Sequence, residues 1–333
     1  MVLDTLTPAC DGERIDPEKT VECTAKQSQA VVFTGAGEAD LRTLSLTDPE
    51  VGEIVVDAHW SGISTGTERM LWSGEMPPFP GLSYPLVPGY ETVGRVIRSD
   101  ADPALVGQFV FVPGARCFRE AAGLFGATAS RLVVSADRVT PLGGKAMPEH
   151  TLLALAATAH HAILRGDGPE LIIGHGVLGR LAARLTLAMG HPAPTVWEIN
   201  PVRRGDAEGY VVVDPSEDAR RDYGTIMDLS GDAGIIDAAL AHARRGVTLT
   251  LAGFYKDRPA FDFPAAFMRE ASLLVAAEFT PADMAAVTAL QRSGALNLAG
   301  LITHTASPQD VGTAYGTAFS DPACLKLIID WGA

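Results

Sequence analysis

Two patterns of hydrophobic and polar positions divide the chain. In its first part, short runs rich in β-branched residues are separated by glycine and proline, which is typical of a small barrel or sandwich. These runs are residues 29–33, 52–63, 91–97, 108–112 and 130–135. The pattern predicts a β-rich domain over residues 29–150.

From about residue 150, short apolar runs alternate with helical stretches. The apolar runs predict strands at 170–174, 195–200, 210–214, 225–231, 246–253 and 272–278. Strands that alternate with helices are typical of an α/β domain with a doubly wound parallel sheet. We therefore expect this sheet over residues 151–303, a return to the first domain over 304–333, and a polar extension over 1–28.

Two of the helical stretches have clear patterns. Residues 177–190 predict an amphipathic helix, because their apolar side chains recur every three or four positions. The apolar face consists of Leu178, Leu181, Ala182, Leu185 and Met189. Residues 232–246 predict a second helix, with Arg244 and Arg245 in its last turn and Gly246 as its stop.

Composition and charge exclude several functions. The chain has 333 residues, 47% of them apolar, and a net charge of −14. This length accommodates two domains. The negative charge argues against binding of nucleic acid or of an anionic membrane surface, because both require lysine and arginine. Residues 151–164 are apolar but too short to span a bilayer, so we expect no transmembrane segment.

The cysteines and the first residues indicate a cytoplasmic protein. Residues 1–28 carry six acidic side chains and no long apolar run, unlike a signal peptide. No two cysteines have C-x-x-C spacing, so they are expected to be free thiols in a reducing compartment. The four are Cys10, Cys23, Cys117 and Cys324.

A glycine motif indicates a dinucleotide site. Gly174, Gly176 and Gly179 have G-x-G-x-x-G spacing, after an expected strand and before an expected helix. The first glycine permits a tight turn, the second lets the pyrophosphate approach the backbone, and the third lets helix and strand pack closely. The helix N-terminus then offers free N–H groups to the phosphates. The alternative is a tight turn without a ligand.

An acidic residue at the end of the next strand favours NAD over NADP. Glu198 follows Gly174 by 24 residues, where a carboxylate accepts hydrogen bonds from the adenosine ribose and repels a 2′-phosphate. The neighbouring Arg203 and Arg204 keep NADP open, since an arginine there can meet that phosphate. Glu198 as a solvated surface acid is the remaining alternative.

Several motifs resemble the medium-chain dehydrogenase/reductase superfamily. They are SGISTGTE (61–68), PLVPGYETVGRV (85–96), GHGVLG (174–179), DLSG (228–231) and LAGF (251–254). The resemblance covers nearly everything after residue 28. It implies a GroES-like barrel for the β-rich domain and a Rossmann fold for the parallel sheet. It also implies that Thr158 and Leu178 contact the nicotinamide.

A narrower resemblance joins residues 61–96 and 321–331 to the dehydrogenases of bacteriochlorophyll biosynthesis. It implies NAD-dependent oxidation of the 3-(1-hydroxyethyl) group of a bacteriochlorophyllide, a tetrapyrrole, to an acetyl group. Two alternatives stay open: a zinc-independent NADPH quinone or enone reductase, and a dinucleotide-binding protein without turnover. A homo-oligomer is possible in each case.

The superfamily's catalytic zinc ligands are missing. Carried over residue by residue, they fall on Ser64 or Thr65, on Tyr90 and near Ala154, while the acid after the second ligand is kept as Glu91. Zinc prefers thiolate, imidazole or carboxylate ligands. A hydroxyl, a phenol and a methyl group do not meet this preference, so we expect no metal.

Without zinc, another group must accept the proton that alcohol oxidation releases. Thr67 matches the superfamily's relay hydroxyl, and Tyr90 brings a phenol to the former metal position. An imidazole is a common general base near neutral pH, which makes His160 or His161 a candidate partner. The structural alternatives are a helix cap for Thr67, a packed ring for Tyr90 and core or surface roles for the histidines.

A large flat substrate requires an apolar cleft. Residues 72–84 form an expected loop rich in apolar side chains and proline: Trp72, Met76, Pro77, Pro78, Phe79, Leu82 and Tyr84. This loop either covers one face of the macrocycle or closes the core of the β-rich domain.

Overall fold

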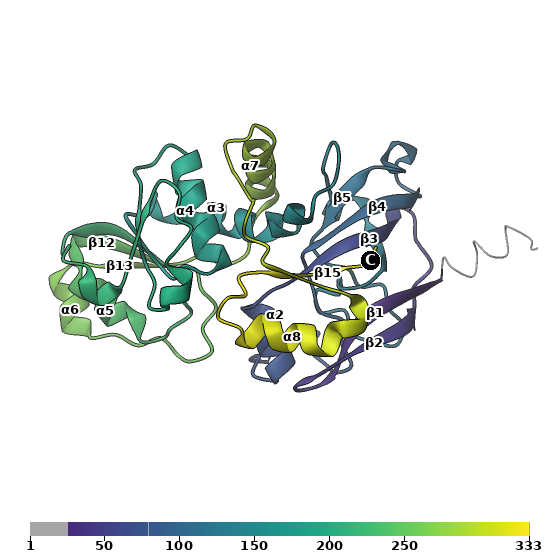
Figure 1. Ribbon diagram of the computed structural model, residues 1–333, viewed down its shortest axis with the longest axis horizontal. Coiled ribbons are helices and arrows are strands. Elements are labelled where there is room, and N and C mark those ends of the chain that lie inside the picture. Colours follow the sequence, from purple (N-terminus) through teal and green to yellow (C-terminus); the bar gives the residue numbers. More distant parts are fainter. Residues whose placement is uncertain (1–25, 79, 333) are drawn as a thin grey trace, which may run out of the picture.

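A computed structural model describes residues 26–78 and 80–332 of the chain. The described residues form two lobes, each built around its own large sheet (Figure 1). The predicted polar extension lies almost wholly outside the described residues, as do Cys10, Cys23 and Phe79. No helix of the described chain is long and apolar enough to cross a membrane.

The first lobe holds a seven-stranded sheet and a two-stranded one. The larger sheet has the order β14-β15-β3-β4-β5-β7, with β6 paired to β3. Its strands are β3 (Glu53–Ile63), β4 (Thr92–Ser99), β5 (Phe109–Val112), β6 (Arg131–Ser135), β7 (Thr140–Pro141), β14 (His304–Ala306) and β15 (Leu327–Asp330). The smaller sheet consists of β1 (Gln27–Gly35) and β2 (Glu38–Ser45), and two helices flank the lobe, α2 (Thr67–Ser73) and α8 (Val311–Ser320).

The second lobe is a six-stranded parallel sheet in the order β10-β9-β8-β11-β12-β13. Its strands are β8 (Leu171–Ile173), β9 (Thr195–Trp197), β10 (Val211–Val213), β11 (Tyr223–Asp228), β12 (Ala243–Leu251) and β13 (Ser272–Val275). Its helices are α3 (Leu153–Gly166), α4 (Val177–Ala188), α5 (Ile235–Ala241), α6 (Phe263–Met268) and α7 (Pro281–Arg292). This strand order is that of a Rossmann fold and confirms the predicted fold class.

Short 3-10 turns complete the described secondary structure. They are η1 (Pro103–Leu105), η2 (Ala136–Arg138), η3 (Pro148–Leu152), η4 (Pro201–Arg203), η5 (Pro215–Glu217) and η6 (Pro308–Asp310).

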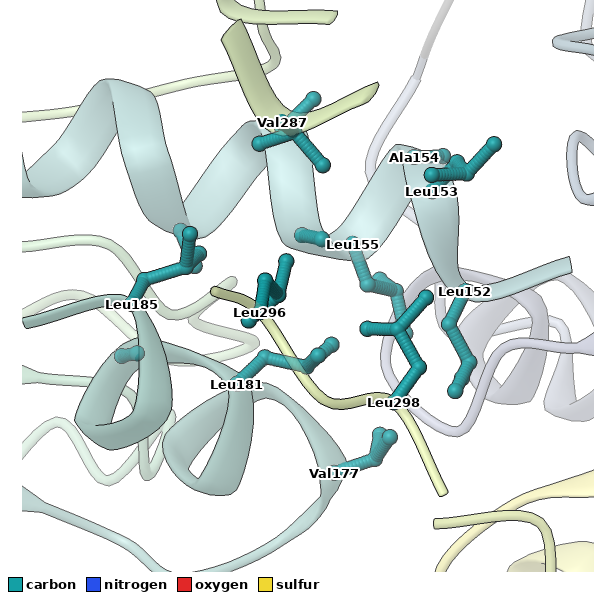
Figure 2. Packing of buried hydrophobic residues seen from close by; sticks show 14 of the residues in the cluster. Leu152, Leu153, Ala154, Leu155, Val177, Leu181, Leu185, Val287, Leu296 and Leu298 are labelled. Carbon is teal, nitrogen blue, oxygen red and sulfur yellow. The ribbon is translucent and has the colours of Figure 1, made fainter. Parts of the chain in front are cut away.

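One apolar cluster packs α3, α4 and α7 of the second lobe together (Figure 2). Leu181 and Leu185 belong to the predicted apolar face of α4. This face lies toward α3 and the segment that carries Leu296 and Leu298. Val287 of α7 packs against the opposite side of α3. Burying a leucine or valine side chain contributes roughly 1.5–3 kcal/mol. The cluster therefore fixes α3 and α4, which border the candidate site.

The last strand returns to the first lobe, where β15 pairs antiparallel with β3 and parallel with β14. Figure 1 shows the chain end beside β3, and α8 packs against β2, which lies far from it in the sequence. The fold thus brings residues 304–330 back to the first sheet. The predicted domain boundaries at 150/151 and 303/304 remain predictions.

Two predicted elements were wrong. The helix expected over 232–246 ends at Ala241, and Arg244 and Arg245 belong to β12 instead. Ala243 already pairs with Tyr223 of β11, because the sheet takes up this segment as soon as the helix ends. Trp72 lies in α2 rather than in a loop, and its ring packs against Phe319 with 5.6 Å between centroids.

Candidate active site

Three hydroxyl side chains meet where the superfamily's metal would lie. Ser64 follows β3 directly, and Tyr90 lies in the turn before β4. The Ser64 Oγ is 2.5 Å from the Tyr90 hydroxyl oxygen. Thr67, the first residue of α2, also hydrogen bonds to Tyr90 through its side chain. The structure therefore brings together two of the predicted residues, Thr67 and Tyr90, and adds Ser64.

The surroundings keep Tyr90 protonated. Its ring packs edge-on against Phe125, with 5.0 Å between centroids. Burial, and then the charge of Glu91, raise the pKa of the phenol well above its ordinary value. A phenolate base would require the opposite shift. Tyr90 is thus suited to pass a proton through its hydroxyl group and unsuited to hold a negative charge.

A buried carboxyl group supports this hydroxyl cluster. Glu68 is fully buried and accepts hydrogen bonds from the Ser64 backbone N–H at 3.1 Å and from the Tyr315 hydroxyl at 3.1 Å. Burial, and then the charge of Glu91, raise its pKa to about 8. Glu68 therefore carries a proton over most of the range around neutral pH.

A second carboxylate, next to Tyr90, has a lysine partner from the end of the chain. Glu91 Oε2 lies 2.5 Å from Lys326 Nζ, and both side chains are completely buried. Lys326 also donates to the Ile63 carbonyl oxygen at 3.0 Å. Burial raises the pKa of Glu91, and Lys326 opposes that rise. Sequence analysis missed Lys326, although a single lysine in the apolar run before the last strand was a signal.

Gly62, near the end of β3, has to be a glycine because Glu91 and Lys326 form their ion pair next to it. A Cβ atom on Gly62 would lie 2.2 Å from Glu91 Oε2. Any larger side chain at Gly62 would displace the carboxylate from Lys326.

The residues at the former zinc position do not fit the metal. Ser64 and Tyr90 bring two hydroxyl groups that are bonded to each other, and Ala154 brings a methyl group buried in the cluster against which Tyr90 packs. Zinc in proteins is held by thiolate, imidazole or carboxylate groups. Within residues 26–78 and 80–332, no three such side chains are grouped to hold a metal ion.

His160, the predicted partner for the proton, is bonded to Asp283 and not to Tyr90. His160 Nδ1 lies 2.8 Å from Asp283 Oδ1, and His161 Nδ1 lies 3.0 Å from Asp283 Oδ2. Burial raises the pKa of Asp283, but hydrogen bonds from Thr280, His160 and His161 lower it to about 2. Because a carboxylate only accepts, each ring donates through Nδ1 and has Nε2 as its basic nitrogen. The structure thus joins α3 to α7 through these histidines and does not link His160 to Tyr90.

The glycine loop has the geometry that the motif predicts. Gly174 adopts a φ of +99°, which favours glycine. A Cβ atom on Gly179 would lie 1.9 Å from the Gly174 carbonyl oxygen, so helix and strand are in close contact there. Gly176, the N-cap of α4, has open space where a Cβ would point. A phosphate group can therefore approach the backbone at Gly176 and the free N–H groups of the helix.

Glu198 lies at the end of β9, against this loop. Its carboxylate accepts from the His175 backbone N–H at 3.0 Å and the Asn200 backbone N–H at 2.8 Å, and the residue is 8% exposed. The alternative of a solvated surface acid is therefore wrong. Arg204 donates to the Glu198 carbonyl and to Asp214, while Arg203 Nε donates to the Pro322 carbonyl at 2.9 Å.

Thr158 lies in α3 and Leu178 in the first turn of α4, and these two helices pack against each other. The Thr158 hydroxyl donates to the Ala154 carbonyl at 3.0 Å, within α3. Leu178, in the first turn of α4, is partly buried against the apolar cluster. Both are available for the predicted contacts, which stay predictions.

The predicted substrate loop is part core and part surface. Met76 is buried, whereas Pro77 and Pro78 are exposed. The Tyr84 hydroxyl donates to the Leu71 carbonyl and so ties the loop to α2. The structure also joins the loop to the other lobe, because Glu75 Oε1 lies 2.5 Å from Lys256 Nζ.

Comparisons with solved structures agree with this fold. The 2R,3R-butanediol dehydrogenase of Bacillus subtilis superposes with a TM-score of 0.79 and 17% identity, over 91% of this chain and 99% of that one. The acetophenone reductase of Geotrichum candidum, solved with NAD, gives 0.78 and 20%, over 92% and 97%. A Sinorhizobium meliloti dehydrogenase bound to NADP gives 0.76 and 18%, over 91% and 99%. At these identities the likeness shows the fold alone: the chain has the two-lobed fold of these dehydrogenases.

Sequence relatives define the family more closely. The 2-desacetyl-2-hydroxyethyl bacteriochlorophyllide A dehydrogenase of Rhodobacter capsulatus is 51% identical over 309 residues, covering 92% of this chain and 98% of that protein. The enzyme of the same name from Cereibacter sphaeroides is 50% identical over 315 residues, covering 92% and 99%. The chain matches no protein-family model. It belongs to the family of these bacteriochlorophyllide dehydrogenases.

Proposed function

We propose that this protein oxidises the 3-(1-hydroxyethyl) group of a bacteriochlorophyllide to an acetyl group, with NAD as the hydride acceptor. The family membership supports the substrate. The observation that carries the chemistry is the hydroxyl cluster of Ser64, Thr67 and Tyr90, which replaces a metal site with hydrogen-bonding groups. This cluster suits an alcohol, which both donates and accepts a hydrogen bond.

The cofactor lies, in this proposal, along the carboxyl ends of the parallel strands. The open backbone at Gly176 and the N-terminus of α4 hold the pyrophosphate, and Glu198 accepts from the adenosine ribose. Residues of this site would hold the dinucleotide, whose nicotinamide would supply the acceptor for the hydride of the carbinol carbon. Arg203 and Arg204 are already bonded to Pro322, Glu198 and Asp214, which supports NAD over NADP.

The protein's own task is to remove the hydroxyl proton. The neutral Tyr90 phenol accepts the substrate's proton while it passes its own to Ser64 or Thr67, so that no charge accumulates on the ring. From there the proton must leave the cluster. His160 remains our proposed outer acceptor, because Asp283 orients its ring with a basic Nε2.

Zinc independence is part of the same proposal. The groups at the former metal position are poor zinc ligands, and the alcohol carbon of this substrate is attached to a conjugated macrocycle. Positive charge that develops at such a carbon is delocalised, which reduces the need for a Lewis acid. We also propose a cytoplasmic location, where nicotinamide cofactors are supplied.

The test is a direct assay with purified protein. We expect 3-hydroxyethyl bacteriochlorophyllide and NAD to give the acetyl product, seen as a shift of the macrocycle's absorption, together with one NADH per product. Activity should persist after chelation, with well under one zinc per chain by metal analysis. Cofactor binding without turnover would refute the proposed oxidation. A requirement for NADPH and an enone would refute the proposed cofactor and substrate. Loss of activity when zinc is removed would refute zinc independence.

A further inference from the structure

A histidine inside the glycine loop is completely buried, and both nitrogens of its ring are hydrogen bonded. His175 occupies the position between Gly174 and Gly176, and its side chain has no exposed surface. Its ring Nδ1 lies 2.6 Å from the Arg203 carbonyl oxygen, and its Nε2 lies 2.9 Å from the Tyr210 hydroxyl. A buried imidazole in a phosphate-binding turn requires an explanation, because an apolar side chain would cost less to bury.

The partners determine the protonation of the ring. A carbonyl oxygen only accepts, so Nδ1 carries the proton and donates to Arg203. Burial is the largest cause that lowers the pKa of His175, to about 4, so the ring is neutral under ordinary conditions. Nε2 is then the acceptor, and the Tyr210 hydroxyl donates to it. The ring therefore has a single tautomer with both nitrogens satisfied.

These bonds connect two separate segments of the site. His175 belongs to the loop after β8, whereas Arg203 and Tyr210 belong to the segment between β9 and β10. Glu198 begins that segment, and its carboxylate bonds to the backbone N–H groups of His175 and Asn200. The segment is thus attached to the glycine loop twice, through the Glu198 carboxylate and through the His175 ring.

A buried arginine reinforces the connection without replacing it. Arg180, in α4, is 2% exposed and donates to the His175 carbonyl at 3.3 Å and to the Arg203 carbonyl at 3.0 Å. Arg180 Nη1 also donates to the Asp206 carbonyl at 3.4 Å, so it holds the middle of the segment. Among the described residues, Tyr210 is bonded to the His175 ring and not to Arg180. Within residues 26–78 and 80–332, only the His175 ring forms hydrogen bonds to both Arg203 and Tyr210.

We propose that His175 is a positioning residue of the cofactor site, whose ring holds the β9–β10 segment so that Glu198 faces the adenosine ribose and discriminates against a 2′-phosphate. This inference rests on the proposed use of NAD. It assigns His175 a role in cofactor affinity and selectivity, and no role in the proton transfer step.

The experiment measures binding of NAD and NADP by calorimetry, so it does not depend on the bacteriochlorophyllide. His175→Leu removes both ring bonds at similar volume. We expect NAD binding to weaken about tenfold or more and the ratio of NAD to NADP affinity to fall at least about fivefold. His175→Asn keeps a donor in the place of Nδ1 and should restore most of the affinity. Tyr210→Phe, which removes only the Nε2 bond, should have a smaller effect in the same direction.

The control is Thr186→Val, which removes a buried hydrogen bond to Ala182 within α4, away from the loop. It should lower the melting temperature and leave both dissociation constants unchanged. An unchanged NAD to NADP ratio in folded His175→Leu, or in Tyr210→Phe should the leucine variant not fold, overturns the proposal. If the unaltered protein binds NAD but does not oxidise the bacteriochlorophyllide, the substrate assignment fails and the test of His175 still stands.

Discussion

The hydroxyl oxygens of Ser64 and Tyr90 lie 2.5 Å apart, although 26 positions separate the two residues in the sequence. Either hydroxyl group can donate in this hydrogen bond, because each both donates and accepts. Thr67 bonds to the same phenol, so the three residues form a connected set of hydroxyl groups, which in the proposed reaction would receive the alcohol. The first prediction concerns this set.

Tyr90→Phe and Thr67→Val should each lower turnover by at least about a hundredfold, while NAD binding is retained. Each change removes one oxygen from the relay with little change in shape, and acid–base groups typically contribute about a hundred- to ten-thousandfold in rate. The measurement is kcat with saturating NAD and substrate. Tyr223→Phe is a matched control, because its hydroxyl bonds to Asp218, away from the cleft. Near-normal turnover in both relay variants would place the relay elsewhere.

His160 and His161 provide a matched pair for the outer proton acceptor. Both donate to Asp283, so replacing either by glutamine removes the same kind of structural bond. If His160 accepts the proton, only His160→Gln should lower turnover and flatten the acidic limb of the pH–rate profile. If both variants have equally lowered melting temperatures and unchanged kinetics, the two histidines have a purely structural role.

Glu198→Gln should weaken NAD binding by roughly five- to a hundredfold and improve NADP binding relative to NAD. The neutral amide accepts more weakly from the ribose and no longer repels a 2′-phosphate, and loss of such bonds typically costs about 1–3 kcal/mol. Dissociation constants for both cofactors provide the measurement. Glu208→Gln, an exposed acid in the same segment, serves as the control. Tighter NADP than NAD binding by the unaltered protein would contradict the assignment.

The raised pKa of Glu68 predicts a pH dependence of stability. Between its ordinary pKa of 4.5 and the folded value of about 8, the folded state keeps a proton that the unfolded state has lost. The free energy of unfolding therefore decreases as pH rises through this window. Glu68→Gln retains an acceptor for the Ser64 N–H and cannot ionise, so the decrease should become shallower. Denaturant unfolding at pH 5 and pH 8 measures it, and an equal slope in both proteins would count against a protonated Glu68.

Lys326→Met should destabilise the protein by about 3–5 kcal/mol, because it leaves the Glu91 carboxylate buried without its counter-charge. Adding Glu91→Gln should restore most of the loss, since the remaining group is neutral. The measurement is the free energy of unfolding of the two single variants and the double variant. Additive losses in the double variant would show that the two side chains act independently.

Local patterns were sufficient for the Rossmann lobe. The spacing of Gly174, Gly176 and Gly179 reflects contacts within a few residues, and the apolar periodicity of 177–190 reflects burial against neighbouring helices. The error at Arg244 and Arg245 arose because a sheet partner, Tyr223, decides where β12 begins. Helix propensity and a plausible stop at Gly246 do not contain that information.

The polar framework of the candidate site was beyond prediction for a related reason. Glu91 and Lys326 are 235 positions apart, and Glu68 and Tyr315 are 247 apart. Nothing in the neighbourhood of either partner signals the other. Likewise, His175 occupies a position of the glycine motif that any residue can take. Its contacts with Arg203 and Tyr210 depend on the fold and leave no mark in the motif.

The position of Lys326 has a consequence for how the protein is made. A ribosome releases β3, β4 and Glu91 long before it releases β15, with the whole Rossmann lobe synthesised in between. During that interval the first lobe has an unneutralised carboxylate in its interior and a β3 strand without its β15 partner. We therefore expect the Rossmann lobe to fold first, and the first lobe to close only when residues 326–330 are available. Nascent chains halted before that point should remain sensitive to protease in the first lobe.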